Sequence, residues 1–101
     1  GHDDLIGTIC LWNFSEDKTQ AELGYELKPV FQGLGLMDEA VKSVLVYSFE
    51  SIGIQTLCAF THHNNNASRR LLEKNGFEFD PDQKDDGNVN NVVYLLNLPL
   101  T

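Results

Sequence analysis

An amphipathic helix predicted between two strands limits the folds open to this chain more than any other feature. The segment Ala21–Leu27 alternates apolar and polar residues, as a half-buried strand does, and Gln55–Thr61 is an apolar run of strand length. Between them, apolar residues recur at helical spacing from about Leu36 to Ser51. Strands joined through one helix pair in parallel by a right-handed crossover. The sequence therefore predicts an α/β fold (mixed α+β) with parallel strands at its centre.

Further strands and a second helix extend this unit along the chain. Both faces of Leu5–Phe14 are apolar, so we expect a strand covered on both sides, joined to Ala21–Leu27 as a hairpin through the polar turn Ser15–Gln20. The 101 residues suit one domain, residues 1–101. The predicted order is strand, strand, helix, strand, helix, strand, strand, with the later elements at about 65–74, 77–79 and 92–98.

The helix Leu36–Ser51 has a predicted inner and outer face. Asp38, Glu39 and Lys42 are expected to face outward, with both carboxylates in the first turn, where they complement the helix dipole. Gly53 is expected to end the helix. The residues expected to pack inward are Met37, Ala40, Val41, Val44, Leu45 and Phe49.

Composition excludes several classes of partner. The net charge is −8, from 15 acidic and 7 basic side chains, which argues against nucleic acid and suits an amine substrate. No apolar run approaches the roughly 20 residues of a membrane span, so we expect no membrane partner. Cys10 and Cys58 lie in apolar runs, where we expect two small buried residues and no metal ligands. Two unpatterned cysteines and no signal segment favour the reducing cytoplasm.

A glycine-containing segment precedes the predicted helix, at Gln32-Gly33-Leu34-Gly35-Leu36-Met37. Backbone N–H groups at a helix start, together with the helix dipole, favour an anion. By itself this segment is either a plain turn or a phosphate cradle. It has no Gly-Lys-Ser/Thr sequence and no third glycine, which excludes a nucleoside-triphosphate loop and a dinucleotide fingerprint.

The segment Asn65–Phe77 reads by itself as a capped amphipathic helix followed by a strand. Asn65 is expected to cap the start of the helix, and Gly76 to follow its end. Arg69 and Arg70 are either a solvated pair or a contact for a phosphate group.

Together the two segments resemble one family, the GNAT N-acetyltransferases. Gln32–Met37 is similar to the loop that binds the pyrophosphate of acetyl-CoA, and Asn65-x-x-Ser68 through Phe77 is similar to the following helix and strand. The lead-in Glu22–Pro29 and the Asn-x-Ala-Ser form resemble the subgroup related to ribosomal-protein N-terminal acetyltransferases. The resemblance covers about Ile6–Phe79.

The resemblance implies a GNAT-like central mixed sheet, acetyl-CoA as cosubstrate and no metal. The strands Ala21–Leu27 and Gln55–Thr61 would splay apart, with the thioester in the resulting V. The backbone of Glu26 and Leu27 would pair with the pantetheine amides, and Asn65 would hydrogen-bond the pantetheine arm. The residues implied at the pyrophosphate are Gln32, Gly33, Leu34, Gly35, Leu36 and Met37.

The implied reaction is direct transfer of an acetyl group to a primary amine, either a protein N-terminus or a small amine. It needs a base for the ammonium and a proton for the leaving thiolate. Glu22 and Glu26 share one strand face, and we favour Glu22 as the base, the alternative being two solvated carboxylates. Leu72 stands where many members of the family have a tyrosine acid, which leaves Ser68 as the donor on that helix.

Two alternatives to an enzyme stay open. One is a non-catalytic CoA- or acyl-CoA-binding module of the same fold, and the other is an unrelated α/β phosphate-binding or protein-interaction domain. The resemblance also implies an N-terminally truncated domain, because the family's acceptor groove is built largely by elements ahead of the first residue here. A sheet cut in this way exposes an edge, so we expect a homodimer or strand exchange.

Overall fold

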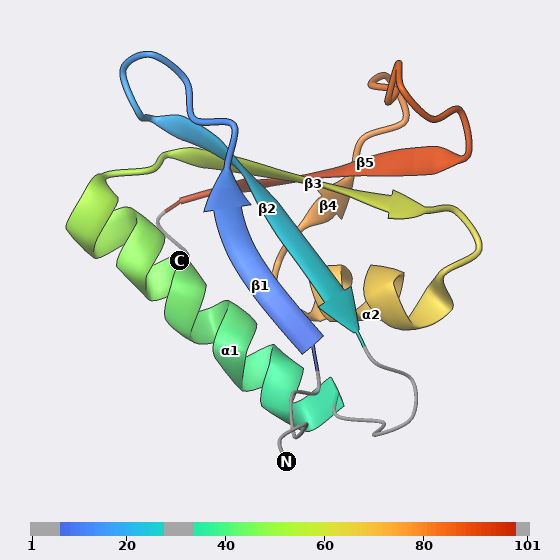
Figure 1. Cartoon of the computed structure of the whole chain (residues 1–101), viewed down its shortest axis with the longest axis horizontal. Coiled ribbons are helices and arrows are strands. Elements are labelled where there is room, and N and C mark those ends of the chain that lie inside the picture. Colours follow the sequence, from blue (N-terminus) through green and yellow to red (C-terminus); the bar gives the residue numbers. More distant parts are fainter. Residues whose placement is uncertain (1–6, 28–33, 99–101) are drawn as a thin grey trace.

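A mixed sheet forms the centre of the computed structural model, which describes residues 7–27 and 34–98 (Figure 1). Within these residues the strands lie in the order β1-β2-β3-β5-β4. β2 and β3 pair in parallel, and the other neighbours pair antiparallel. The predicted hairpin, parallel pair and mixed sheet are confirmed. The strands are β1 (Gly7–Trp12), β2 (Gln20–Leu27), β3 (Thr56–His62), β4 (Glu78–Phe79) and β5 (Asn91–Asn97).

Both helices of the described residues pack on the same face of this sheet (Figure 1). α1 spans Leu34–Tyr47 and connects β2 to β3. It continues into a π-helical turn, Ser48–Ile52, which ends at Gly53 with φ 89°, as predicted. α2 spans Asn66–Lys74, between β3 and β4. In the part of the chain that the structure describes, no helix has the length and apolarity to cross a membrane.

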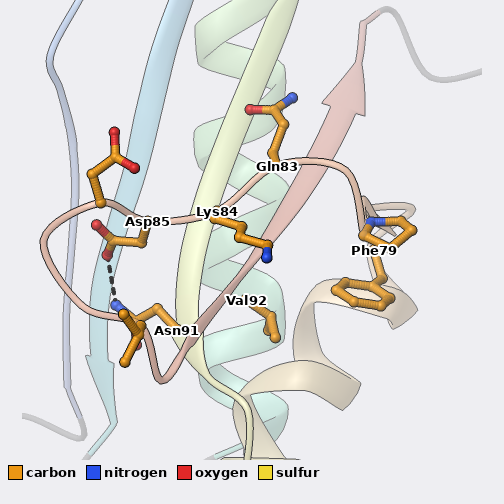
Figure 2. Close-up of a pocket in the computed structure, with 9 residues that line it drawn as sticks. Phe79, Gln83, Lys84, Asp85, Asn91 and Val92 are labelled. Carbon is orange, nitrogen blue, oxygen red and sulfur yellow. Dashed lines mark hydrogen bonds between the residues drawn. The ribbon is translucent and has the colours of Figure 1, made fainter.

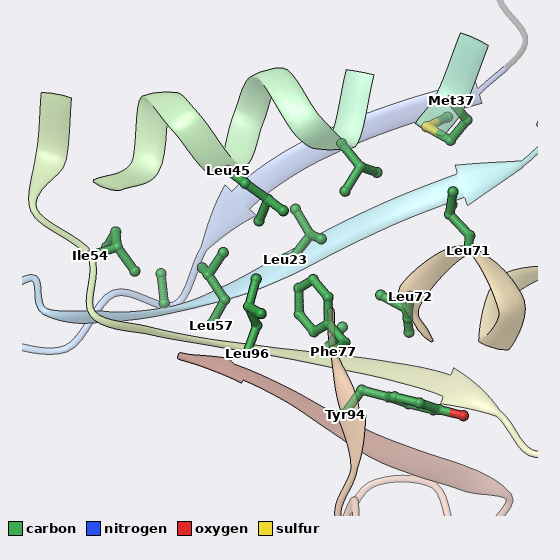
Figure 3. Packing of buried hydrophobic residues seen from close by; sticks show 13 residues of the cluster. Leu23, Met37, Leu45, Ile54, Leu57, Leu71, Leu72, Phe77, Tyr94 and Leu96 are labelled. Atoms are coloured by element: carbon green, nitrogen blue, oxygen red, sulfur yellow. The ribbon is translucent and has the colours of Figure 1, made fainter. Parts of the chain in front are cut away.

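The hydrophobic core lies between these helices and the covered face of the sheet. Figure 3 shows side chains from α1, α2 and three strands meeting there. Burial of aliphatic side chains contributes about 1.5–3 kcal/mol each, so this layer fixes the helices on the sheet. The buried hydrophobic cluster consists of Ala21, Leu23, Met37, Val41, Leu45, Ile54, Leu57, Ala59, Leu71, Leu72, Phe77, Tyr94 and Leu96.

The first turn of α1 and the burial of two residues, Asp38 and Phe49, differ from the prediction. The helix begins at Leu34, so Asp38 and Glu39 follow its first turn, and the dipole role expected of them is wrong. Asp38 is buried, at 8% exposed, although Glu39 is exposed as predicted. Phe49 is 40% exposed because it lies in the π-helical turn, whose wider spacing rotates side chains off the helical pattern.

In the described residues no helix covers the opposite face of the sheet, which corrects the prediction for the first strand. β1 has one strand neighbour in the described residues, and its Trp12 is 51% exposed. Cys10 is exposed and Cys58 is half-buried, so the expectation that both cysteines are buried is wrong. The physical reason is that α1 and α2 both lie on the other face.

Asp38 joins α1 to the end of α2. Its Oδ2 lies 2.6 Å from Lys42 Nζ, and its Oδ1 accepts a 2.7 Å hydrogen bond from Asn75 Nδ2. The same Asn75 amide donates to Leu71 O at 2.9 Å. Hydrogen bonds from Lys42 and Asn75 hold the pKa of the Asp38 carboxyl below its usual value. This contact fixes the end of α2 relative to α1.

We predict that Asp38→Asn lowers the thermal unfolding midpoint at pH 7. A carboxyl whose pKa is lowered by folding stabilises the fold above its unfolded pKa, and that stabilisation is lost as the pH falls through the folded pKa. The midpoint difference should therefore shrink towards acid pH in calorimetric scans. Glu39→Gln, on the exposed side of α1, is the control. An equal difference at every pH would contradict the role assigned to the charge.

Candidate active site

A fork between β2 and β3 is the main irregularity of the sheet. The two strands pair only at Gln20↔Thr56, Ala21↔Leu57 and Glu22↔Cys58. Beyond this point β2 stays paired with β1, and β3 stays paired with β5, but the two central strands separate (Figure 1). We call the separated ends, residues 23–27 and 59–62, the fork. Their facing backbone groups have no strand partner across the gap in the described residues.

The first turn of α2 lies at the fork. Asn65 caps this helix, because its Oδ1 accepts a 3.1 Å hydrogen bond from Ser68 N, as predicted. Ser68 is 2% exposed, and its Oγ accepts a 2.8 Å hydrogen bond from Thr61 Oγ1 on β3. The Tyr25 hydroxyl on β2 contacts the same Oγ. These three side chains, the hydroxyl cluster, therefore connect both arms of the fork to α2.

Glu22 lies at the last pair before the fork, on the sheet face away from the helices. Its side chain alternates with buried Leu23, yet Glu22 is only 8% exposed. Its carboxylate has one weak hydrogen bond, from Asn13 Nδ2 at 3.5 Å. Burial raises the pKa of the Glu22 carboxyl, and the charge of Asp85 raises it further. The alternative of a solvated carboxylate is therefore wrong for Glu22.

The loop between β4 and β5 brings Asp85 to this face. Figure 2 shows the loop passing across β3, with Asp85 beside β2. Asp85 is held in place because its Oδ2 accepts a 2.9 Å hydrogen bond from Asn91 Nδ2. Under the loop lies a pocket of about 420 Å³ whose charged lining is two carboxylates, Asp85 and Asp86, and one ammonium, Lys84, and whose apolar lining includes Phe79 and Val92. This lining suits a cationic molecule with an apolar part.

Comparison with known proteins identifies the family. The model of the acetyltransferase (GNAT) domain matches residues 1–78. The chain belongs to the GNAT acetyltransferase family. It is 36% identical over 75 residues to the uncharacterized N-acetyltransferase YoaA of Bacillus subtilis, covering 74% of this chain and 42% of that protein. It is 30% identical over 73 residues to the putative ribosomal N-acetyltransferase YdaF of the same organism, covering 72% and 40%.

A solved structure supports the same fold. The Campylobacter jejuni N-acetyltransferase PseH in complex with acetyl coenzyme A superposes with a TM-score of 0.73 at 23% identity, covering 98% of this chain and 64% of that one. The GNAT-like fold predicted from the sequence is thus confirmed. The chain spans about two fifths of the length of the curated relatives described above.

The residues predicted to bind acetyl-CoA fall in four places, one of which is Asn65 at the start of α2. Gln32 and Gly33 lie outside the described residues. Glu26 and Leu27 form the end of β2, on one arm of the fork. The first turn of α1, whose backbone N–H groups have no intrahelical partner, consists of Leu34, Gly35, Leu36 and Met37. The Met37 side chain packs in the core, so only its backbone is available to a ligand of this GNAT domain.

Sequence reasoning missed Tyr25 and Thr61. They share a strand face with apolar residues, which predicts ordinary core positions, and only the divergence of β2 and β3 places both hydroxyls beside Ser68.

The surroundings of Arg69 argue against the alternative that it contacts a phosphate group. Its guanidinium donates to Tyr94 OH and His63 O, both at 2.9 Å, which favours a structural role over a phosphate contact. Within residues 7–27 and 34–98, no cluster of three or more His, Cys, Asp or Glu could hold a metal.

We predict that Glu22→Gln raises the thermal unfolding midpoint at pH 7. A carboxyl whose pKa is raised by folding favours the folded state most when protonated, and the stability falls as the pH rises from the ordinary value of 4.5 through the folded pKa. Glutamine removes this penalty while keeping the shape. The two midpoints should converge below pH 4.5. A lower unfolding midpoint for Glu22→Gln at pH 7 would contradict the cost that burial is expected to impose on the Glu22 charge.

Proposed function

We propose that this GNAT domain transfers an acetyl group from acetyl-CoA to a primary amine. The observation that carries the proposal is the fork, with a buried carboxylate of raised pKa at its closed end and a hydroxyl cluster between its arms. The fork supplies backbone groups for an extended ligand, and the two side-chain sites supply a base and a proton donor on opposite sides of the sheet. Relatives named as N-acetyltransferases support this assignment.

The residues present fit acetyl-CoA. Its pantetheine arm is extended and carries amides, which match the backbone groups of residues 23–27 in β2 that face the gap of the fork. Its pyrophosphate is an anion, which matches the free N–H groups at the start of α1. Acetyl-CoA would supply an acetyl group activated as a thioester. The complex of PseH with acetyl coenzyme A supports this choice of ligand.

Glu22 is proposed as the base that accepts the proton of the incoming ammonium. A base works best when its pKa lies near the operating pH, and burial moves the pKa of Glu22 in that direction. A backbone N–H of the fork can donate to the oxyanion that develops on the acyl carbonyl. Ser68, between the arms, is proposed as the proton donor for the leaving thiolate.

Direct transfer fits better than a covalent acetyl-cysteine. Cys58 is the thiol nearest to the proposed base, since it pairs with Glu22 in the sheet. Burial raises the pKa of the Cys58 thiol, and the Glu22 charge raises it further. A thiol held protonated is a poor nucleophile. The amine itself is therefore the attacking group.

The acceptor is proposed to be a cationic amine, either a protein N-terminus or a small amine. Asp85 lies on the face that carries Glu22 and lines the pocket together with Asp86 (Figure 2). A positively charged acceptor would be attracted to these carboxylates before it loses its proton. Similarity to YdaF, a putative ribosomal N-acetyltransferase, favours a ribosomal acceptor.

We predict that the chain binds acetyl-CoA and releases CoA thiol when amines are added. Calorimetric titration measures binding, and a thiol reagent measures release with a panel of peptide N-termini and polyamines. No binding at high micromolar acetyl-CoA would overturn the proposal. Binding without thiol release from any amine would identify the chain as the non-catalytic CoA-binding module instead.

We predict that Glu22→Gln lowers kcat by about 100-fold or more, since a positioned base contributes about 10²–10⁴. Acetyl-CoA affinity should stay nearly unchanged, because Glu22 lies on the face away from α1 and α2. In the wild-type chain, kcat should fall as the pH drops through the raised pKa of Glu22. Glu39→Gln is the matched control. Unchanged turnover in Glu22→Gln would remove Glu22 as the base.

We also propose that the chain self-associates through β1. This strand has one strand neighbour in the described residues, and it exposes Cys10 and Trp12 on the uncovered face. A free strand edge is a template for pairing with a second copy. Light scattering should give a mass above 11.3 kDa, and Trp12→Lys should lower it, whereas Val46→Lys on α1 should not. A monomeric wild-type chain would contradict this proposal.

A further inference from the structure

The hydroxyl cluster consists of three side chains from three different elements. Tyr25 comes from β2, Thr61 from β3 and Ser68 from α2. Tyr25 and Thr61 each lie three residues beyond the last β2–β3 pair, Glu22↔Cys58, so they occupy matching positions on the two arms. Ser68 lies between them and contacts both. The cluster therefore spans the fork by side-chain hydrogen bonds where backbone pairing has ended.

We propose that Tyr25 and Thr61 are positioning residues that direct the Ser68 proton into the fork and stabilise the oxygen that gives it up. This inference rests on the proposed function, because it concerns the donor to the leaving thiolate of CoA. Nothing in the sequence motif marks either residue for this role.

The Ser68 hydroxyl can donate one hydrogen bond and accept two, because a hydroxyl has one proton and two lone pairs. Thr61 Oγ1 donates to Ser68 Oγ at 2.8 Å. The Tyr25 hydroxyl contacts the same oxygen as well as the Ser68 carbonyl oxygen, and in the proposed arrangement Tyr25 is the second donor to Ser68 Oγ. With both lone pairs occupied, the Ser68 proton points away from Tyr25 and Thr61. This assignment leaves the Ser68 proton without an acceptor in the cluster, and the acceptor proposed for it is the sulfur of CoA held between the arms.

Burial makes these two contacts energetically important. Ser68 is 2% exposed, so water does not compete for its oxygen. Hydrogen bonds to a charged oxygen are about twice as strong as neutral ones, so two hydroxyl donors favour an oxygen that has lost its proton. Burial raises the pKa of the Tyr25 phenol. Tyr25 therefore keeps a proton to donate at neutral pH.

In the proposed step the amine nitrogen forms a bond to the acyl carbon of the thioester. The C–S bond of the thioester breaks and its electron pair stays on sulfur. Ser68 Oγ gives its proton to that sulfur and takes the proton of the Tyr25 hydroxyl. The Tyr25 oxygen then recovers a proton from solvent. The nitrogen loses two protons between ammonium and amide, one to Glu22 before attack and one to solvent after the N–C bond forms, so each turnover releases one net proton. Thr61 donates throughout and exchanges no proton.

The test measures the pKa of the thiol of CoA bound to the chain, which requires no turnover. The protein is saturated with CoA, and thiolate absorbance is followed as the pH rises, with desulfo-CoA as the blank for tyrosine ionisation. Loss of a hydrogen bond to a charged sulfur should raise the thiol pKa by about 1 in Ser68→Ala. Tyr25→Phe and Thr61→Val should raise it by less, and Thr61→Ser should restore the wild-type value.

Controls separate this role from a structural one. Tyr47→Phe removes an exposed phenol on α1, and Ser43→Ala removes an exposed hydroxyl on the same helix, and neither should change the thiol pKa. CoA affinity and the unfolding midpoint are measured for every variant. If CoA does not bind the wild-type chain, the proposed function fails. If CoA binds but Tyr25→Phe and Thr61→Val leave the thiol pKa unchanged, or Tyr25→Phe exceeds Ser68→Ala, this inference is overturned.

Discussion

The short parallel pairing of β2 with β3 is the constraint on which the rest of this structure depends. Three residue pairs join the strands, and both strands then continue apart. A longer pairing would satisfy the facing backbone groups and leave no place for an extended ligand. A shorter one would detach the two halves of the sheet, because β1 reaches β3 only through β2. Glu22 at the last pair, with the hydroxyl cluster just beyond it, depends on the same register.

The position of α2 keeps the strands apart. Its first turn places Ser68 between Tyr25 and Thr61, and its end is held to α1 through the hydrogen bond from Asn75 to Asp38. Leu71 and Leu72 add the apolar contact with the core. The helix is therefore fixed at both ends by polar contacts and along its length by burial. β2 and β3 make no backbone hydrogen bonds to each other at the fork, and the contacts of both strands with α2 hold them in place instead.

Local sequence patterns predicted the helices and strands, whereas the burial and contacts of several side chains depend on residues far away in the sequence. The Asn65 cap and the Gly53 stop depend on neighbouring backbone groups, so they are visible in the sequence. The burial of Asp38 depends on Asn75, which is 37 positions away, and so the helical pattern placed it outside. Cys10 looked buried because a two-sided apolar strand was taken to have cover on both faces. The pairing of Tyr25 with Ser68 across 43 positions had no local signal at all.

Each arm of the fork also has an outer strand paired along its length. β1 stays in register with β2 as far as Leu27, and β5 with β3 as far as His62. The arms are thus two-stranded ribbons, whose backbone dihedrals are already restricted before any ligand arrives. A ligand that enters between them orders its own chain but has little protein backbone left to order. Binding at the fork should therefore carry a small conformational-entropy cost on the protein side, and affinity should depend mainly on the flexibility of the ligand.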